Sequence, residues 1–323
     1  MTKVGLVLGA GGMVGLAYHA GVLHALEELA GVVANDADLI VGTSAGSVAG
    51  AYLRSGWSTE DFWQLALGTH PELQGLGSTD PGRKREIFVP TFRGPLDLWR
   101  RGMGSSFVLA RSLLRMPAPR VPSMLQWAFP GGMFTMVEGR RRFAEELPDE
   151  WPDRELWLCA VNIGSGRRIV LGRGEYARTT SLRRAALASC AIPGLYQPVR
   201  IGSMTLVDGG AVSTTNLDLA VAAGCDLIIG VVPMAFDTER RPHPLRQLVR
   251  RIPSRALSAE LAGAKRAGAT VLLLRPSPDE VRLHGLDVMR GDGLDAVAMA
   301  AYESTARALE TRRFQEALAS RAD

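Results

Sequence analysis

One short stretch, DLIVGTSAG at residues 38–46, decides the fold because it combines a strand, a sharp turn and the start of a helix. The apolar run 39–41 suits a buried strand, and the small residues after Ser44 suit a helix packed closely on a sheet. A Gly-x-Ser-x-Gly in this context holds the serine in a strained backbone, with its hydroxyl projecting above the sheet, while Gly42 and Gly46 leave room for crossing backbones. Ser44 is therefore our candidate nucleophile. The alternative is that it only caps a helix.

A second glycine turn, LVLGAGGMVG at residues 6–15, follows an apolar run at the N-terminus. We expect a strand that ends near Leu8 and a helix over about 15–29. The backbone N–H groups of Gly11, Gly12 and Met13 are candidate donors to an oxyanion. Glycine lets the anion approach closely, and the helix N-terminus adds partial positive charge.

The same turn nearly satisfies dinucleotide-binding spacing through Gly9, Gly11 and Gly15. That fingerprint also needs an acidic residue at the end of the second strand. Here the strand ends in Gly-Thr-Ser, and the acidic residues lie before it or at its start. We therefore reject the cofactor hypothesis and assign Gly9 and Gly15 to the support of the turn.

A base for the serine is offered by VDGG at residues 207–210. An apolar stretch leads to Asp208, and Gly209 and Gly210 allow a sharp bend beside another backbone. A carboxylate can act directly as general base to a serine within hydrogen-bond reach. The alternative is that Asp208 is an ordinary turn aspartate. Only its pairing with Ser44 favours a catalytic role over this alternative.

A histidine-based triad remains an alternative. His243 and His284 follow Asp208 in the chain order Ser, Asp, His, although no motif surrounds either of them. His19 and His24 fall within the first predicted helix, where we expect them to be packing or surface residues.

Four blocks occur in the order of a known family: the glycine turn, GTSAG at 42–46, ASCAIPG at 188–194 and VDGG at 207–210. They resemble the patatin-like phospholipases of bacterial type, and the resemblance covers residues 1 to about 235. It implies a three-layer α/β/α fold with a mainly parallel central sheet. It also implies a Ser44–Asp208 dyad that hydrolyses fatty acyl esters of glycerolipids through an acyl-enzyme. This scheme needs no cofactor and no metal ion.

Two residues depart from the family pattern. Val14 stands where the family usually places arginine or lysine, so one cationic support of the turn is missing. Either the activity is lower, or packing holds the turn instead. Asp218 replaces the proline of an Asn-x-Pro that often follows the family's Asp-Gly-Gly, and we expect it to alter only the start of the next helix. Two alternatives remain. An acyltransferase or thioesterase would use the same serine, and a protein that keeps the fold but has lost catalysis would be a lipid-binding regulatory protein.

The 323 residues, 46% of them apolar, can bury one large core or two modest ones. We expect a single α/β domain over 1–323, with a cap or lid insertion at about 75–135. Further strands are predicted near 155–163, 168–171, 226–233 and 270–275, an antiparallel hairpin at 162–167, and a long helix at 294–309.

The insertion region is strongly basic. Between residues 83 and 142, twelve Arg or Lys stand against three acids, a net +9, whereas the whole chain carries +4. Seven aromatic residues lie in the same region, and Phe107 with residues 110, 113 and 114 fits one helical face. Basic and apolar residues interleaved in this way favour contact with an anionic membrane. The alternative is a lid whose arginines are simply solvated. No nucleic-acid-binding module is recognisable.

Cys159, Cys190 and Cys225 show no C-x-x-C spacing, so neither a disulfide framework nor a zinc site is indicated. There is no run of 18 apolar residues, and the apolar N-terminus forms the glycine turn and is not a signal peptide. We expect a cytoplasmic protein, with peripheral membrane contact through 83–142. The sequence does not decide its oligomeric state.

Overall fold

A computed structural model of the chain describes residues 2–72, 88–114, 131–177, 179–235 and 256–319, with the side chains of 108–114 excepted. These residues form two compact units. The first comprises Met1–Thr79, Pro152–Leu156 and Ser213–Asp323, and the second comprises Asp80–Trp151 and Trp157–Val212.

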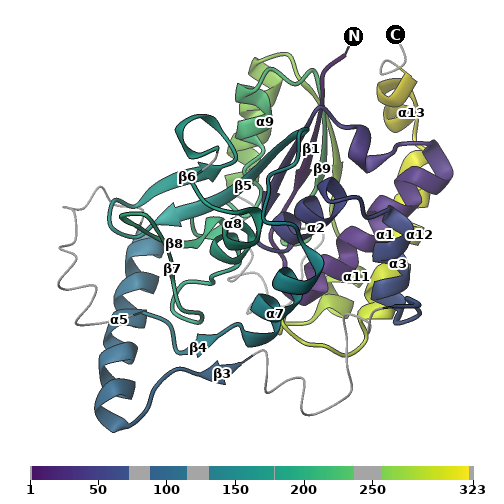
Figure 1. Cartoon of the computed structure of the whole chain (residues 1–323). Helices are drawn as coiled ribbons and strands as arrows, with labels where there is room; N and C mark the ends of the chain where they lie inside the picture. The colour runs from purple at the N-terminus through teal and green to yellow at the C-terminus, as the bar shows by residue number, and fades with distance from the viewer. Residues whose placement is uncertain (1, 73–87, 115–130, 178, 236–255, 320–323) are drawn as a thin grey trace. The chain divides into compact units, whose positions relative to one another are not determined.

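The first unit is built on a parallel sheet (Figure 1). Its strands, in spatial order, are β10 (Thr270–Leu274), β9 (Leu227–Val231), β1 (Val4–Leu8) and β2 (Leu39–Thr43). All residues of β1, β2 and β9 are buried. Such continuous apolar runs are typical of parallel strands covered on both faces. The mainly parallel central sheet with flanking helices that the sequence predicts is therefore confirmed, and the fold is of the α/β class.

Helices cover this sheet. On one face, α1 (Gly12–Ala30) packs against α2 (Ala45–Arg54), α3 (Thr59–Leu67) and α12 (Leu294–Leu309), with α11 (Pro278–His284) beside α12. The other face is covered by α9 (Asp218–Ala222) and a helix at 256–266, whose Leu257 and Leu261 join a core cluster with Val232. The chain's last helix in the described part is α13 (Arg312–Ala319), and η1 (Ala34–Asp36) precedes β2. The helix predicted at 294–309 matches α12.

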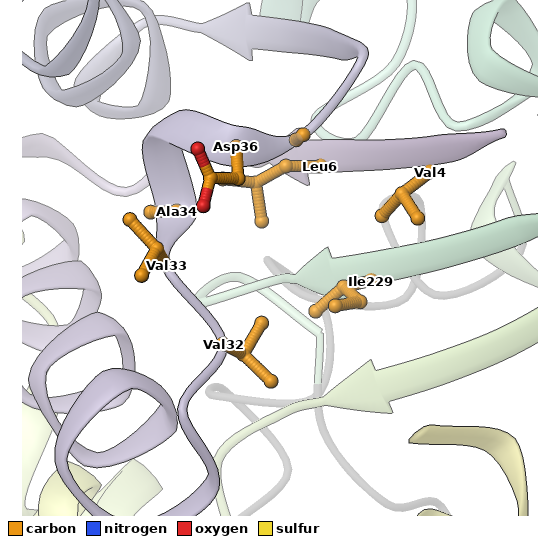
Figure 2. Close-up of a pocket in the computed structure, with 8 residues that line it drawn as sticks. Val4, Leu6, Val32, Val33, Ala34, Asp36 and Ile229 are labelled. Atoms are coloured by element: carbon orange, nitrogen blue, oxygen red, sulfur yellow. The ribbon is translucent and has the colours of Figure 1, made fainter. Parts of the chain in front are cut away.

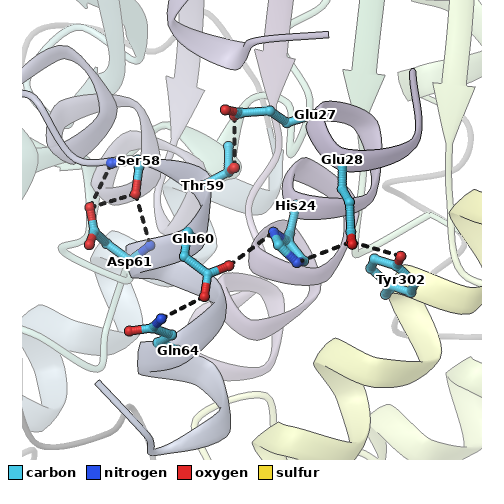
Figure 3. Close-up of polar contacts among 9 residues, drawn as sticks. All are labelled: His24, Glu27, Glu28, Ser58, Thr59, Glu60, Asp61, Gln64 and Tyr302. Atoms are coloured by element: carbon cyan, nitrogen blue, oxygen red, sulfur yellow. Dashed lines mark hydrogen bonds and ion pairs between the residues drawn. The ribbon is translucent and has the colours of Figure 1, made fainter. Parts of the chain in front are cut away.

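Three helices of this unit meet at a polar cluster (Figure 3). The imidazole of His24 on α1 lies 3.3 Å from a Glu28 carboxylate oxygen and 3.5 Å from one of Glu60 on α3. Its ring stacks on Trp63 at 4.9 Å, and the Tyr302 hydroxyl on α12 donates to Glu28 at 2.8 Å. His24 therefore has the packing role expected of it.

The second unit has antiparallel pairing. Its strands run in the order β6 (Arg167–Leu171), β5 (Glu155–Asn162), β8 (Met204–Asp208) and β7 (Val199–Ile201). The first two residues of β5 belong to the first unit and the rest to the second. The β5–β6 connection is the hairpin predicted from the sequence, closed by a bond from the Gly166 amide to the Asn162 carbonyl at 2.7 Å. The remaining elements are β3 (Val89–Pro90), α5 (Pro95–Leu114), β4 (Phe134–Thr135), α7 (Val137–Glu146), η2 (Gly174–Tyr176), α8 (Leu182–Ser189) and η3 (Gly209–Ala211).

The insertion predicted at about 75–135 lies partly outside the described residues, so the single-domain organisation stays a prediction. Its described part contains β3, α5 and β4. In the part of the chain that the structure describes, none of the helices combines the length and the apolar character needed to cross a bilayer.

Candidate active site

Ser44 occupies the turn between β2 and α2 and has an unusual backbone. Its φ is 53° and its ψ is −117°. Among the described residues other than glycine, only Ser44 and Asn216 have positive φ. Such a conformation costs about 1–3 kcal/mol and persists only where the surrounding structure enforces it, typically at functional sites. The strained strand–turn–helix expected for a nucleophilic serine is therefore present.

Neighbouring backbones explain the two glycines of this motif. A Cβ on Gly42 would lie 2.6 Å from the Cα of Ser47, and a Cβ on Gly46 would lie 1.9 Å from the carbonyl oxygen of Leu8. The second distance is far below any contact between real atoms. Because α2 crosses directly over the end of β1, no side chain fits at residue 46.

The glycine turn between β1 and α1 leaves three amides open. The N–H groups of residues 11–13 have no hydrogen-bond acceptor among the described residues. The amides on either side are bonded, in the pairs Gly9 to Val231, Ala10 to Thr214 and Val14 to Val288. The open amides lie at the N-terminus of α1, where the helix dipole adds positive potential. They belong to the three residues predicted as oxyanion donors.

A segment near the C-terminus covers this turn. Gly12 has φ +62°, and a Cβ there would lie 2.6 Å from the carbonyl oxygen of Val288 and 2.9 Å from the Sδ of Met289. This contact was not predicted, because residues 285–293 carry no motif. Val14 is buried and its amide donates to Val288 at 3.1 Å, so uncharged contacts hold the turn where the family usually has a cation.

The glycine turn and the serine turn are joined directly. The Gly46 amide donates to the Gly9 carbonyl at 3.2 Å. A Cβ on Gly15 would lie 3.6 Å from the Cβ of Ala45, so the first turns of α1 and α2 are in contact. The N–H of Ala45 also has no acceptor among the described residues. Sequence reasoning missed this fourth open amide, although the residue after a nucleophilic serine commonly supplies an oxyanion donor.

Asn216 supports the serine turn and was also missed. Its φ is 56°, a left-handed conformation that asparagine tolerates better than most residues. Its side-chain amide donates to the Thr43 hydroxyl at 2.9 Å and to the Ser213 carbonyl at 2.7 Å. From the sequence, residue 216 was noted only as the asparagine of the family's Asn-x-Pro pattern, before a predicted helix. That helix is α9, and it begins at Asp218 as expected.

Asp208 lies in the second unit, at the end of β8. Its Oδ1 accepts the Gly210 amide at 2.7 Å, and its own amide donates to the Ala191 carbonyl at 2.9 Å. A Cβ on Gly209 would lie 2.5 Å from the Cys159 carbonyl oxygen, so glycine is required there. The 188–194 block forms the end of α8 and the turn after it, and this turn holds the Asp208 backbone in place through the Ala191 carbonyl.

The histidines have different environments. His284 is buried at the end of α11, its ring 5.5 Å from that of Tyr18, and His243 lies outside the described residues. His19 is completely buried on α1, and its Nε2 lies 2.8 Å from the Gly9 carbonyl oxygen.

A small cavity of about 20 Å³ lies beside the first unit's sheet (Figure 2). It is lined almost entirely by apolar side chains, with Val4, Leu6 and Ile229 from the strands and Asp36 from η1. It adjoins the amino-terminal half of β1, whereas the glycine turn follows that strand's carboxyl end. Its volume is about that of one water molecule, so it is not a substrate site.

An α/β fold with a Gly-x-Ser-x-Gly turn beside open helix-terminal amides defines a class of proteins that present a serine at the edge of a parallel sheet. Within that class, the chain belongs to the patatin-like phospholipase family, whose model matches residues 6–221.

Individual relatives are distant. The chain is 28% identical over 229 residues to "Lysophospholipase nte1" of Aspergillus fumigatus and, equally, to that of Neosartorya fischeri. The match covers 71% of this chain and 12% of each relative, so the chain spans about an eighth of their length. Among solved structures, VipD from Legionella pneumophila has a TM-score of 0.43 and 15% identity, with 96% of this chain and 67% of that chain covered.

Proposed function

We propose that the protein is a serine lipid acyl hydrolase, of the phospholipase A, lysophospholipase or esterase type, with Ser44 as nucleophile and Asp208 as its base. The observation that carries this proposal is the strained backbone of Ser44 immediately before Ala45 and Gly46, which contact the glycine turn. Three amides of that turn have no acceptor among the described residues. Membership of the patatin-like phospholipase family supports it, as do two relatives named as lysophospholipases.

The reaction proceeds in two steps. The Ser44 hydroxyl attacks the ester carbonyl, Asp208 accepts its proton, and the oxyanion is held by the amides of Gly11, Gly12 and Met13. Collapse of this intermediate breaks the ester bond, and the leaving alcohol takes the proton back from Asp208. Water then attacks the acyl-enzyme with the same carboxylate as base. The fatty acid leaves and the Ser44 hydroxyl is restored.

Local geometry favours Asp208 as the base. The carboxylate follows directly on a strand end, its backbone is held by the Ala191 carbonyl, and one of its oxygens is fixed by the Gly210 amide. A carboxylate whose position is fixed in this way can act as general base to a serine within hydrogen-bond reach. The amide of Ala45 would add a fourth donor. Removal of one oxyanion donor typically costs about 10²–10³ in turnover.

The proposal is tested by labelling with a fluorophosphonate and by fatty-acid release from a panel of glycerolipids and short nitrophenyl esters. We expect the wild type to be labelled at residue 44 and to release fatty acid. Ser44→Ala should abolish both, whereas Ser55→Ala, at the opposite end of α2, should change neither. Asp208→Asn should abolish turnover in a folded protein.

A folded wild type that is neither labelled nor active would refute the hydrolase, and substantial activity in Asp208→Asn would refute the dyad. Added alcohols or thiols separate hydrolysis from transfer, because a transferase would yield mainly new esters or thioesters.

We further propose that α5 contacts an anionic membrane that supplies the lipid substrate. An apolar row follows one side of this helix, with exposed fractions of 71% for Leu96, 57% for Trp99, 51% for Met103 and 45% for Phe107. At about 100° per residue these side chains fall within about 80° of each other. Ser105, on the opposite side, is buried and accepts the Gly132 amide at 2.9 Å.

Charge favours an anionic partner for this row. Arg100 stands next to it on the helix, and residues 83–142 carry a net +9. Arg101 is paired with Asp97 at 3.0 Å. Apolar side chains that enter the headgroup boundary beside basic residues are typical of helices that lie on membranes.

Flotation with vesicles of phosphatidylcholine, with and without phosphatidylserine, tests this contact. We expect recovery only with the anionic vesicles, and its loss in the double variant Trp99→Ser with Met103→Ser. Leu98→Ser is the matched control, because Leu98 lies on the other side of α5. Equal recovery of wild type and double variant would refute the contact.

A further inference from the structure

We infer that His19 is a positioning residue: its imidazole holds the Gly9 carbonyl and thereby fixes the glycine turn against the serine turn. This inference rests on the proposed function, in which the glycine turn binds the oxyanion. From the sequence, His19 was expected to be a packing or surface residue.

The Gly9 carbonyl oxygen receives two hydrogen bonds. One comes from Nε2 of His19 at 2.8 Å and the other from the Gly46 amide at 3.2 Å. A carbonyl oxygen has two lone pairs, so both of its acceptor positions are used. One atom of the glycine turn therefore connects α1 with α2 immediately after the nucleophile.

The same peptide unit is fixed on its other side. The Ala10 amide, which shares the peptide plane with the Gly9 carbonyl, donates to the Thr214 carbonyl at 2.7 Å. The first open amide, that of Gly11, belongs to the next peptide unit. The peptide plane between Gly9 and Ala10, which His19 holds, therefore orients the next peptide unit and with it the first open N–H group. Val14 stands where the family usually places a cation, and the hydrogen bonds to the Gly9 carbonyl come from His19 and Gly46.

The protonation state of His19 follows from its contacts. To donate to a carbonyl, Nε2 must carry hydrogen, and within the described residues the buried Nδ1 has no hydrogen-bond partner. Burial lowers the pKa of His19 to about 4, against a smaller opposing effect of the bond to Gly9. The neutral imidazole with hydrogen on Nε2 is therefore the form present near neutral pH.

The unsatisfied Nδ1 shows what this side chain contributes. A buried polar atom without a partner is unfavourable, and an apolar side chain at residue 19 would avoid it. Packing alone therefore does not call for a histidine here. The bond from Nε2 to Gly9 is the contribution that an apolar residue cannot make.

Two substitutions at residue 19 separate this bond from packing. His19→Leu fills the space without a donor, and His19→Gln places an amide N–H near the position of Nε2. We expect His19→Leu to lower kcat by up to about 100-fold with little change in KM, as for a small misplacement of catalytic groups. His19→Gln should restore most of kcat. Leu26→Ala, in the same buried helix face but away from the turn, should lower the melting temperature and leave kcat unchanged.

A structural readout keeps this test independent of catalysis. In nitrogen NMR spectra of the wild type we expect the His19 ring to carry its hydrogen on Nε2, and the Gly46 amide to exchange at least about tenfold faster in His19→Leu. Failure of fluorophosphonate to label Ser44 would refute the proposed function and leave these spectra unaffected. A wild-type ring with its hydrogen on Nδ1, or a folded His19→Leu with wild-type kcat and Gly46 protection, would overturn the inference.

Discussion

The side-chain amide of Asn216 lies 2.9 Å from the hydroxyl oxygen of Thr43, the residue immediately before the strained serine. The two residues are 173 positions apart in the chain. The bond connects the segment before α9 to the base of the serine turn, so the conformation of Ser44 depends on a side chain from the far end of the family-matched region.

Removal of this bond should destabilise the serine turn. Thr43→Val should lower the free energy of unfolding by about 1 kcal/mol, the usual contribution of one hydrogen bond. Asn216→Gly should cost more, because the Asn216 amide also donates to the Ser213 carbonyl. Glycine is chosen at 216 because it keeps the positive φ without strain. In urea denaturation the double variant should lose less than the sum of the two, because both remove the same bond. Strict additivity would show that the two side chains do not interact.

Gly12 and Gly31 form a matched pair, since both have φ +62° and only Gly12 has close neighbours. Gly31→Ala should cost about 1 kcal/mol of unfolding free energy through the left-handed backbone alone. Gly12→Ala should cost more, because the added Cβ meets Val288 and Met289, and it should also lower kcat by displacing the open amides. Equal thermal stability and full activity for both variants would contradict the packing described for the turn.

Gly46→Ala should prevent folding or lower the melting temperature strongly, because its Cβ would overlap the Leu8 carbonyl oxygen. Gly263→Ala is the control within the same unit. There a Cβ meets only the flexible Arg266 guanidinium at 3.8 Å, so the substitution should be neutral or stabilise the helix by about 0.5–1 kcal/mol. A Gly46→Ala protein with wild-type stability would be incompatible with the crossing of α2 over β1.

Acid should destabilise the protein through His19. Its pKa is about 4 in the folded protein and about 6.5 when unfolded, so the unfolded chain binds more protons between these values. The free energy of unfolding therefore falls as pH falls through this window, by about 2 kcal/mol between about pH 7 and pH 5 from this residue. Denaturant unfolding at both pH values measures it. In His19→Gln the difference in free energy of unfolding between the two pH values should be smaller by this amount. The same difference in variant and wild type would show that His19 does not stay neutral in the folded protein.

Local sequence was sufficient for the elements around the site. Gly42 and Gly46 predicted a turn crowded by crossing backbones, and the structure has such a turn. The three residues chosen as oxyanion donors have amides without an acceptor among the described residues, as does Ala45, and their role in the reaction stays a prediction. Local reasoning reaches this far because a tight turn and the first residues of a helix depend on nearby residues. The same reasoning placed α12 at its observed bounds and the β5–β6 hairpin at its observed turn.

Contacts between distant segments were not predictable in this way. Val288, which accepts the Val14 amide, lies in a segment without motifs, and Asn216 was noted only for its place before a helix. The role of His19 was not predicted either. Helical periodicity shows that a side chain points inward, but it does not show which atom that side chain contacts.

The sequence by itself indicated the α/β class and the turns at Ser44 and Asp208, since these depend on apolar patterning and short-range sterics. The family followed from the resemblance of its four motif blocks. Tertiary structure decided which carbonyl receives the His19 hydrogen bond and which remote groups brace the serine turn. These contacts arise only when packing of the helices on the sheet brings together backbone groups whose orientation no local pattern specifies.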